Sequence, residues 1–412
     1  MPRDYNLIRE ICKSHSHISG VLIDEKMMYY ADEKENLGKK IKAKLKYYEH
    51  VTKSWPASYI NFTIAQLIIH QIFKRDGLIH KYMNHAFVKS FSEADQQFLK
   101  EHQKKPWRYV FASIVSTPSA DFYEMEDVFS EDLFLFYSPS LKDTLKETTP
   151  TLWLLLIGYN GHCWQSFGLN IPLANVTPDD IFYFATEINP RIEDEEDIID
   201  DMDINPIPYL MLMNLGISPI IHHKGHKLSH WSAENHVTKY NFDASKLNQS
   251  FFIAWNADVF ELKLKRYNQF PHCAVAYYDE SNNILFRYAF TEQGFSKLTQ
   301  ALNKMGFNLF DEAEINVSFH MHQLLESMLK KEIIMNPYDS LFEKNNDSSS
   351  SDEENKEEEE LINLRKFLDV AIIRYNNNEP VDVDSIAEQL GADIEMARRV
   401  WKSFSDTLKR KK

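Results

Sequence analysis

The chain has 412 residues, 43% of them hydrophobic, and a formal net charge of -15. This length and apolar content can supply two or three domains with packed cores, which excludes a wholly disordered or fibrous protein. The longest apolar runs, such as residues 152–157, are far too short to span a membrane, and the first residues lack the apolar core of a signal peptide. We therefore expect no membrane contact. The three cysteines form no CxxC pair and fit a reducing compartment, so we expect a cytoplasmic protein.

The negative charge is concentrated in two segments, 191–203 and 347–360, each with eight acidic residues and one basic residue. The rest of the chain is nearly neutral, and its two ends, 1–108 and 397–412, are basic. The acidic balance is therefore a property of two segments and does not exclude nucleic acid as a partner.

Residues 1–105 are predicted to be helical. Ile41 and Leu45 recur at helical spacing within 38–53, with lysines on the other side, and Ser92 can cap a later helix. From residue 106 to 190 the pattern changes to short runs of aromatic and β-branched residues, which predict a β-meander followed by a helix.

Turn and cap signals support this second region. Asn160-Gly161 is a strong hairpin signal, and Thr177 precedes a proline and two acids in the manner of a helix N-terminus. The acidic segment that follows, 191–204, is predicted to be a loop, because runs of like charge usually lie in solvent.

Residues 205–342 predict a second α+β region, with an apolar helix, four short strands and a helix capped by Thr291. Residues 343–360 are predicted to be a disordered acidic linker, because they contain almost no residue that could be buried. Residues 361–412 are predicted to form a separate helical module. The predicted fold class is α+β, with a helical N-terminal region, antiparallel β-meanders with packed helices, and this module after the linker.

Motifs for common enzymatic chemistry are absent. The chain has only 11 glycines and contains neither a P-loop nor a GxGxxG sequence, so ordinary phosphate-binding loops are not expected. The GxSxG and HExxH signatures of common hydrolases are also missing. An active site assembled from scattered residues remains open.

Five histidines fall within residues 222–236, and three of them, His222, His226 and His230, are spaced by four residues. That spacing would place three imidazoles on one face of a helix, with Glu234 nearby as ligand or base, so zinc or another divalent metal is one interpretation. The other is a polar loop with solvated imidazoles, because Gly225 interrupts the segment. We therefore predict no cofactor and keep the metal as the alternative.

Two His-Cys dipeptides, His162-Cys163 and His272-Cys273, invite comparison with a thiol nucleophile and its base. Adjacent residues of a strand point to opposite faces, so neither histidine is expected to activate its neighbour. We interpret the cysteines as buried structural residues.

The tail resembles a helix-turn-helix segment. Ala387 and Gly391 match the alanine and the turn glycine of that motif, and its apolar positions are matched by Ile386, Leu390, Ile394 and Val400. The resemblance implies that the second helix contacts nucleic acid through Arg398, Arg399 and Lys402, with the phosphate backbone contacted by Lys409, Arg410, Lys411 and Lys412. Similar Ala-x-x-x-Gly patterns occur in protein-interaction modules, including three-helix bundles of the ubiquitin-associated type, and acidic Asp393 and Glu395 begin the second helix.

The sequence favours an intracellular, non-enzymatic binding protein whose tail contacts a protein partner, a second copy of the chain, or nucleic acid. The alternative is a metal-dependent hydrolase that uses the histidines between His222 and His236.

Overall fold

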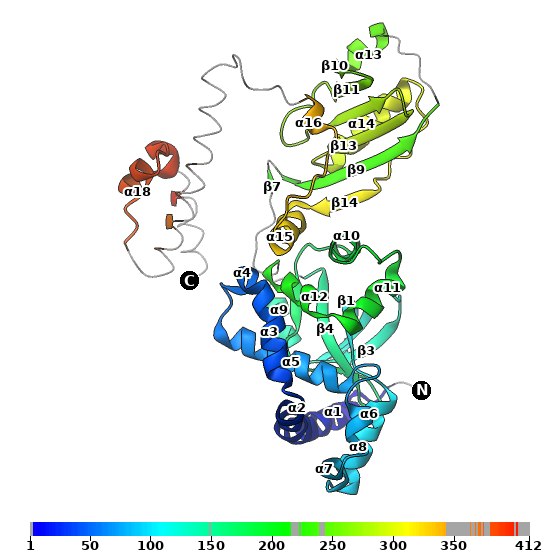
Figure 1. The fold of residues 1–412 in the computed structure, drawn as a ribbon, viewed down its shortest axis with the longest axis vertical. Helices are drawn as coiled ribbons and strands as arrows, with labels where there is room; N and C mark the ends of the chain where they lie inside the picture. Colours follow the sequence, from blue (N-terminus) through cyan, green and yellow to red (C-terminus); the bar gives the residue numbers. More distant parts are fainter. Residues whose placement is uncertain are drawn as a thin grey trace. The chain divides into compact units, whose positions relative to one another are not determined.

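A computed structural model of the chain describes residues 3–147, 150–215, 222–223, 225–238, 244–342, 363, 367, 370–371, 374, 380–398 and 401–402. The protein is α+β, as predicted, and divides into two compact units, Met1–Tyr338 and Asp339–Lys412 (Figure 1). The predicted linker, 343–360, lies outside the described residues. None of the described helices is long and apolar enough to cross a membrane.

The N-terminal region of the larger unit is helical, as predicted. It begins with a continuous stretch that ends at Asn36, whose left-handed φ of 53° cannot continue a helix; the stretch comprises α1 (Tyr5–Ser19), the π-helical η1 (Gly20–Met27) and α2 (Met28–Glu35). The predicted helix at 38–53 is divided into three shorter elements. The remaining helices are α3 (Leu37–Leu45), η2 (Lys46–Tyr48), α4 (Glu49–Thr52), α5 (Ala57–Phe73), α6 (Ile79–Tyr82), α7 (Ala86–Lys89) and α8 (Glu93–Lys104).

The predicted meander forms a sheet that closes on itself. In the ring β1–β2–β3–β5–β4–β1 every pairing is antiparallel except that of β3 with β5. A sixth strand, β6, pairs with β4, and α9 (Leu141–Glu147) follows β3. The strands are β1 (Arg108–Ser119), β2 (Phe122–Asp127), β3 (Leu133–Tyr137), β4 (Leu152–Tyr159), β5 (Trp164–Ser166) and β6 (Ile171–Leu173).

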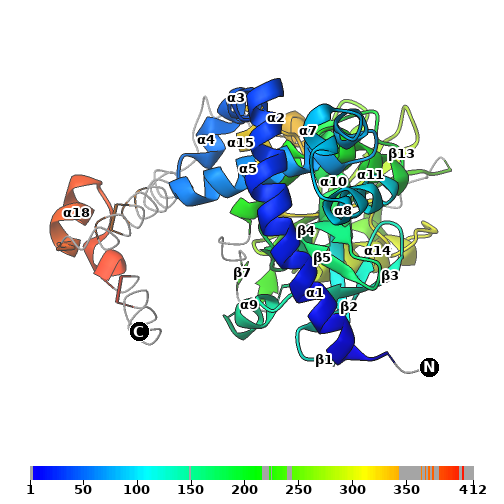
Figure 2. The ribbon, with the colours of Figure 1, turned by 90° about the horizontal axis from the view of Figure 1, so that it is seen from below.

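Alternation along the strands gives this sheet two apolar faces, because successive side chains of a strand point to opposite sides. One set of alternating residues forms a cluster enclosed by the ring, with members Val110, Ala112, Tyr123, Met125, Phe134, Phe136, Trp153, Leu155 and Ile157. The intervening residues face outward onto helices. On one side they meet α1, which runs beside the sheet in Figure 2 and buries Ile8 and Cys12 against Phe122 and Leu135.

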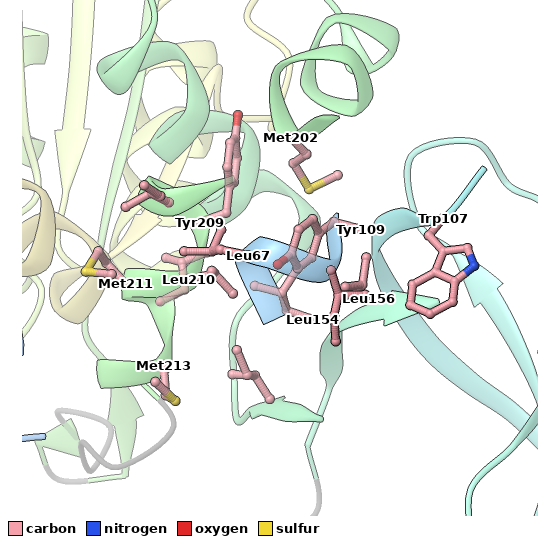
Figure 3. Close-up of a cluster of buried hydrophobic side chains, with 14 of the residues drawn as sticks. Leu67, Trp107, Tyr109, Leu154, Leu156, Met202, Tyr209, Leu210, Met211 and Met213 are labelled. Atoms are coloured by element: carbon pink, nitrogen blue, oxygen red, sulfur yellow. The ribbon is translucent and has the colours of Figure 1, made fainter. Parts of the chain in front are cut away.

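The main core lies on the other outward side. Figure 3 shows Tyr109, Leu154 and Leu156 of the sheet together with Leu67 of α5. Apolar residues between 202 and 213 complete this cluster. Met202 comes from α11 (Glu195–Ile204), Tyr209 and Leu210 come from α12 (Ile207–Leu210), and Met211 and Met213 come from η3 (Met211–Asn214).

Helices α10 and α11 follow the closed sheet in the sequence, and α11 corrects the prediction of an acidic loop at 191–204. Thr177 caps α10 (Pro178–Ile188) as expected, and the structure adds that Thr177 and Asp180 form a capping box. Residues Glu195–Ile204 form helix α11. Its N-terminus is capped by the carboxylate of Asp194, and three acids in its first turn face the positive end of the helix dipole, so the negative charges favour the helix.

The second β region of the larger unit is an open antiparallel sheet with the order β10-β11-β12-β13-β9-β14. Four of its strands coincide with the four predicted, namely β10 (Phe251–Asn256), β11 (Val259–Leu264), β12 (Val275–Asp279) and β13 (Ile284–Ala289). The other elements here are β7 (His222–His223), β8 (His226–Lys227), β9 (Ser229–His236), α13 (Ala244–Ser250), α14 (Glu292–Lys304), β14 (Ile315–Ser318) and α15 (Phe319–Leu329).

Helix α14 covers one face of this open sheet. Its N-cap is Thr291, as predicted, and its apolar side packs Phe295, Leu298 and Leu302 against the strands. Arg287 of β13 is buried on the same face, where it donates to the hydroxyl of Thr299, and burial lowers its pKa to about 10.

Within the larger unit, the carboxylate of Asp180 links α10 of the first region to the start of α15 in the second. One of its oxygens accepts the backbone N–H of Thr177 (3.0 Å), and the other accepts the N–H of Ser318 at the start of α15 (2.7 Å). Asp180 is 1% exposed. A single side chain therefore completes a helix cap in the first region and binds a backbone donor of the second.

Candidate functional site

The described part of the tail contains the turn that the sequence predicts. Helix α18 (Val383–Gln389) begins after Asp382, whose carboxylate accepts the N–H of Ser385 (3.2 Å). Gly391 follows with a left-handed φ of 65°, which explains the need for glycine.

A second helical stretch follows this turn at 394–398. It is capped by Asp393, whose carboxylate accepts the N–H of Met396 (2.7 Å). Small residues fill the space where the helices meet, and the buried cluster contains Phe367, Ala371, Ile386, Ala387, Ala392 and Ala397. The alanine and glycine that carry the resemblance thus occupy a close helix contact and a chain reversal.

Arg398, the first predicted reader of nucleic acid, is bound within the module. Its guanidinium group donates from Nε to one oxygen of Asp384 (2.7 Å) and from a second nitrogen to the other oxygen. This fork lowers the pKa of Asp384 and raises the pKa of Arg398. Lys402 is exposed. The other predicted contacts lie outside the described residues; they are Arg399, Lys409, Arg410, Lys411 and Lys412.

The start of the second helix presents acidic and apolar side chains to solvent. Asp393 and Glu395 are exposed, Ile394 is 36% exposed and Met396 is 46% exposed. We call these four residues the acidic-apolar surface. In a helix-turn-helix protein the start of the second helix lies against the DNA. The carboxylates of Asp393 and Glu395 would repel the DNA phosphates there.

The predicted histidine face is wrong, because His226 and His230 lie on strands β8 and β9 rather than on a helix. Nδ1 of His230 lies 2.5 Å from the hydroxyl oxygen of Tyr288, and its ring stacks on Phe319 at a centroid distance of 4.3 Å. Burial, together with nearby His322, lowers the pKa of His230 to about 3. His230 is therefore a neutral core side chain. The backbone of His222 lies in β7, and its side chain is not among the described ones.

His226 has a different set of neighbours. Its ring meets that of His272 edge to face, at a centroid distance of 4.8 Å, beside a cavity of about 460 Å³ at the N-terminus of α14. Nδ1 of His272 lies 2.7 Å from the hydroxyl oxygen of Thr291. Within the part of the chain that the structure describes, no group of three or more His, Cys, Asp or Glu side chains is arranged to hold a metal ion.

Two residue pairs that the sequence does not connect come together in the structure. The Sγ atoms of Cys12 and Cys163 are 3.3 Å apart, and the Nε2 atoms of His15 and His102 are 3.1 Å apart. Their members are separated by 151 and 87 residues. The hairpin signal at Asn160-Gly161 fixes the position of Cys163, but nothing in the sequence points from it to α1.

Comparisons with known proteins give no relative. No family model, no curated protein and no solved structure matches this chain. The residues of the chain itself are therefore the basis for a functional assignment.

Proposed function

We propose that the chain is a non-enzymatic binding protein whose C-terminal module docks onto a protein partner. The observation that supports this best is the fork between Arg398 and Asp384. It engages a side chain that the helix-turn-helix resemblance assigns to nucleic-acid contact, and a guanidinium group that already donates two hydrogen bonds to a carboxylate has less to offer a phosphate or a guanine edge.

The acidic-apolar surface indicates the chemistry of the partner. Ile394 and Met396 can fill a shallow apolar groove, and methionine adapts well to irregular partners. Asp393 and Glu395 flank them with negative charge, which favours a partner with basic side chains around an apolar contact. We therefore propose a basic, partly apolar peptide segment as the ligand class.

Selection from a random peptide library displayed on phage tests this proposal. The bait is the full chain, and the matched control is a chain that ends at residue 342, which retains the larger unit. We expect the full chain to enrich peptides that combine basic and apolar positions, and the shortened chain to bind them at least about tenfold more weakly.

The same two proteins are titrated with a labelled DNA duplex to separate the alternatives. Salt-sensitive duplex binding by the full chain, lost on shortening, would favour nucleic acid as the partner instead. Failure to enrich any peptide, or equal peptide binding by both chains, would remove the proposed docking function.

A further inference from the structure

Cys12 and Cys163 form a close, buried pair of thiols between a helix and a turn. Helix α1 carries Cys12, and the turn between β4 and β5 carries Cys163; their side chains are 0% and 1% exposed. Their Sγ atoms are 3.3 Å apart, compared with about 2.05 Å in a disulfide. A movement of about 1 Å therefore brings the sulfur atoms to bonding distance.

Asn160 holds the two sulfur atoms in this arrangement. Its Nδ2 donates to Sγ of Cys12 (3.2 Å) and to Sγ of Cys163 (3.5 Å), while its Oδ1 accepts the backbone N–H of Cys163 (2.8 Å). From the sheet side, Nε2 of Gln165 donates to the carbonyl oxygen of Cys12 (3.2 Å). The hydrogen bonds thus fix both the helix and the turn that present the thiols.

The two thiols differ in acidity. The hydrogen bond from Cys163 lowers the pKa of Cys12, with further help from Asn160 and from the charge of Arg9, although burial opposes the shift. The same contact, together with burial, raises the pKa of Cys163. Of the two thiols, Cys12 is therefore the one that loses its proton more readily.

Cys163 lies next to the exposed residues of a short turn. Gly161 and His162 are exposed, and they lie in the same turn as Asn160 and Cys163. Gly161 has a left-handed φ of 94°, and a methyl group added to it would meet no atom within 4 Å, so this part of the turn packs against little. Local opening of one surface turn is enough to admit a small oxidant, without unfolding of the sheet.

We propose that Cys12 and Cys163 form a redox modification site at which hydrogen peroxide produces an intramolecular disulfide. The Cys12 thiolate attacks one peroxide oxygen, the O–O bond breaks, and the released hydroxide takes a proton to become water. Cys12 is then a sulfenic acid. The Cys163 sulfur, after losing its proton, attacks Sγ of Cys12, the S–O bond breaks, and a second water leaves. The two thiols lose two electrons and two protons, and the peroxide is reduced to two waters.

The disulfide would tie α1 to the closed sheet. The bond spans 151 positions of the chain, and in the chain-entropy view a bridge over such a distance restrains the unfolded chain strongly. Oxidation should therefore stabilise the larger unit without changing its fold.

Peptide mapping under non-reducing conditions tests the proposal on the full chain. After peroxide treatment, alkylation and trypsin digestion, we expect peptide 10–13 to be linked to peptide 147–191, with the loss of two hydrogen atoms. The link should form in the wild type and in the control Cys273→Ser, and not in Cys12→Ser or Cys163→Ser. We also expect the urea midpoint of the oxidised wild type to rise by about 1 M over the reduced protein.

Two results would overturn the proposal. One is recovery of both peptides as alkylated thiols, or as sulfinic or sulfonic acids, after peroxide treatment. The other is a linked product that contains peptide 267–287, which carries Cys273, in place of the expected pair. If either serine variant fails to fold, the wild type and Cys273→Ser still decide the test: the linked peptide in both supports the proposal, and its absence from both contradicts it.

Discussion

At the scale of single residues, buried polar side chains decide how this chain is assembled. Asp180 is the clearest case, because its two oxygens accept backbone N–H groups from Thr177 and Ser318, which belong to different β regions. The local half of this arrangement, the helix cap, is predictable from the sequence. The other half is not, because it depends on a residue 138 positions away.

We expect Asp180→Ala to lower the free energy of unfolding by about 2–4 kcal/mol, since it removes a cap and leaves a buried N–H of Ser318 unsatisfied. Neighbouring Asp179 is exposed and is the matched control; Asp179→Ala should cost less than about 1 kcal/mol. Urea unfolding measures both. Equal losses in the two variants would contradict the role given to Asp180.

The pair of His15 on α1 and His102 on α8 is a second feature at this scale. Trp107 donates to Nδ1 of His102 (2.8 Å), so His102 carries its proton on Nε2 and donates it to Nε2 of His15. Protonation of His15 would place two N–H groups face to face. Burial lowers the pKa of His15 to about 4 and the pKa of His102 to about 3, so both are neutral at pH 7.

Stability should therefore fall as the pH is lowered. The unfolded histidines take up protons below about pH 6.5 and the folded ones do not, so each lowers the free energy of unfolding by up to about 1.4 kcal/mol per pH unit between about pH 6 and the folded pKa. Urea midpoints at about pH 7, 6 and 5 measure the slope. His15→Gln should reduce it, and His17→Gln, at an exposed position on the same helix, should not; equal slopes in the two variants would refute this explanation.

At the scale of elements, local signals succeeded where a helix or strand is decided by its own residues. Thr177, Ser92 and Thr291 cap helices as predicted, because cap chemistry involves residues only three positions apart. The errors arose where tertiary packing decided. Charge alone predicts a loop for the acids of α11, whereas Ile198 and Met202 are buried at helical spacing. Neither the helical face nor the polar loop that the sequence suggests for the histidines describes His230, which lies on β9, a strand paired on both edges.

Two glycines give an element-scale prediction. A methyl group on Gly158 of β4 would lie 2.7 Å from Nε1 of Trp107, whereas one on Gly20 of η1 meets nothing within 4 Å. Gly158→Ala should therefore destabilise the protein by about 1–3 kcal/mol, and Gly20→Ala should stabilise it by up to about 1 kcal/mol. Thermal and urea unfolding measure the change in stability of each variant relative to the wild type. A neutral or stabilising Gly158→Ala would show that β4 can move away from Trp107.

At the scale of the whole molecule, the sequence identified an α+β protein with a separate helical tail, and it placed Gly391 and Asp393 at the tail's turn. It did not predict that Asp384 would engage Arg398, because a side chain fourteen residues away meets its partner only after the helices pack. That ion pair engages one of the side chains that the helix-turn-helix resemblance assigns to nucleic acid, and it is the observation on which we base the proposal of protein docking.

The most direct test of this account compares the affinity of a selected peptide for the full chain and for the double variant Ile394→Asp, Met396→Asp. Both side chains are exposed, so the substitutions should leave the fold of the tail intact. The matched control, Glu388→Ala, changes an exposed residue of α18 outside the acidic-apolar surface. We predict a loss of affinity of at least about tenfold for the double variant and less than about twofold for the control. Equal affinity of the double variant and the wild type would contradict the proposal that this surface binds the partner.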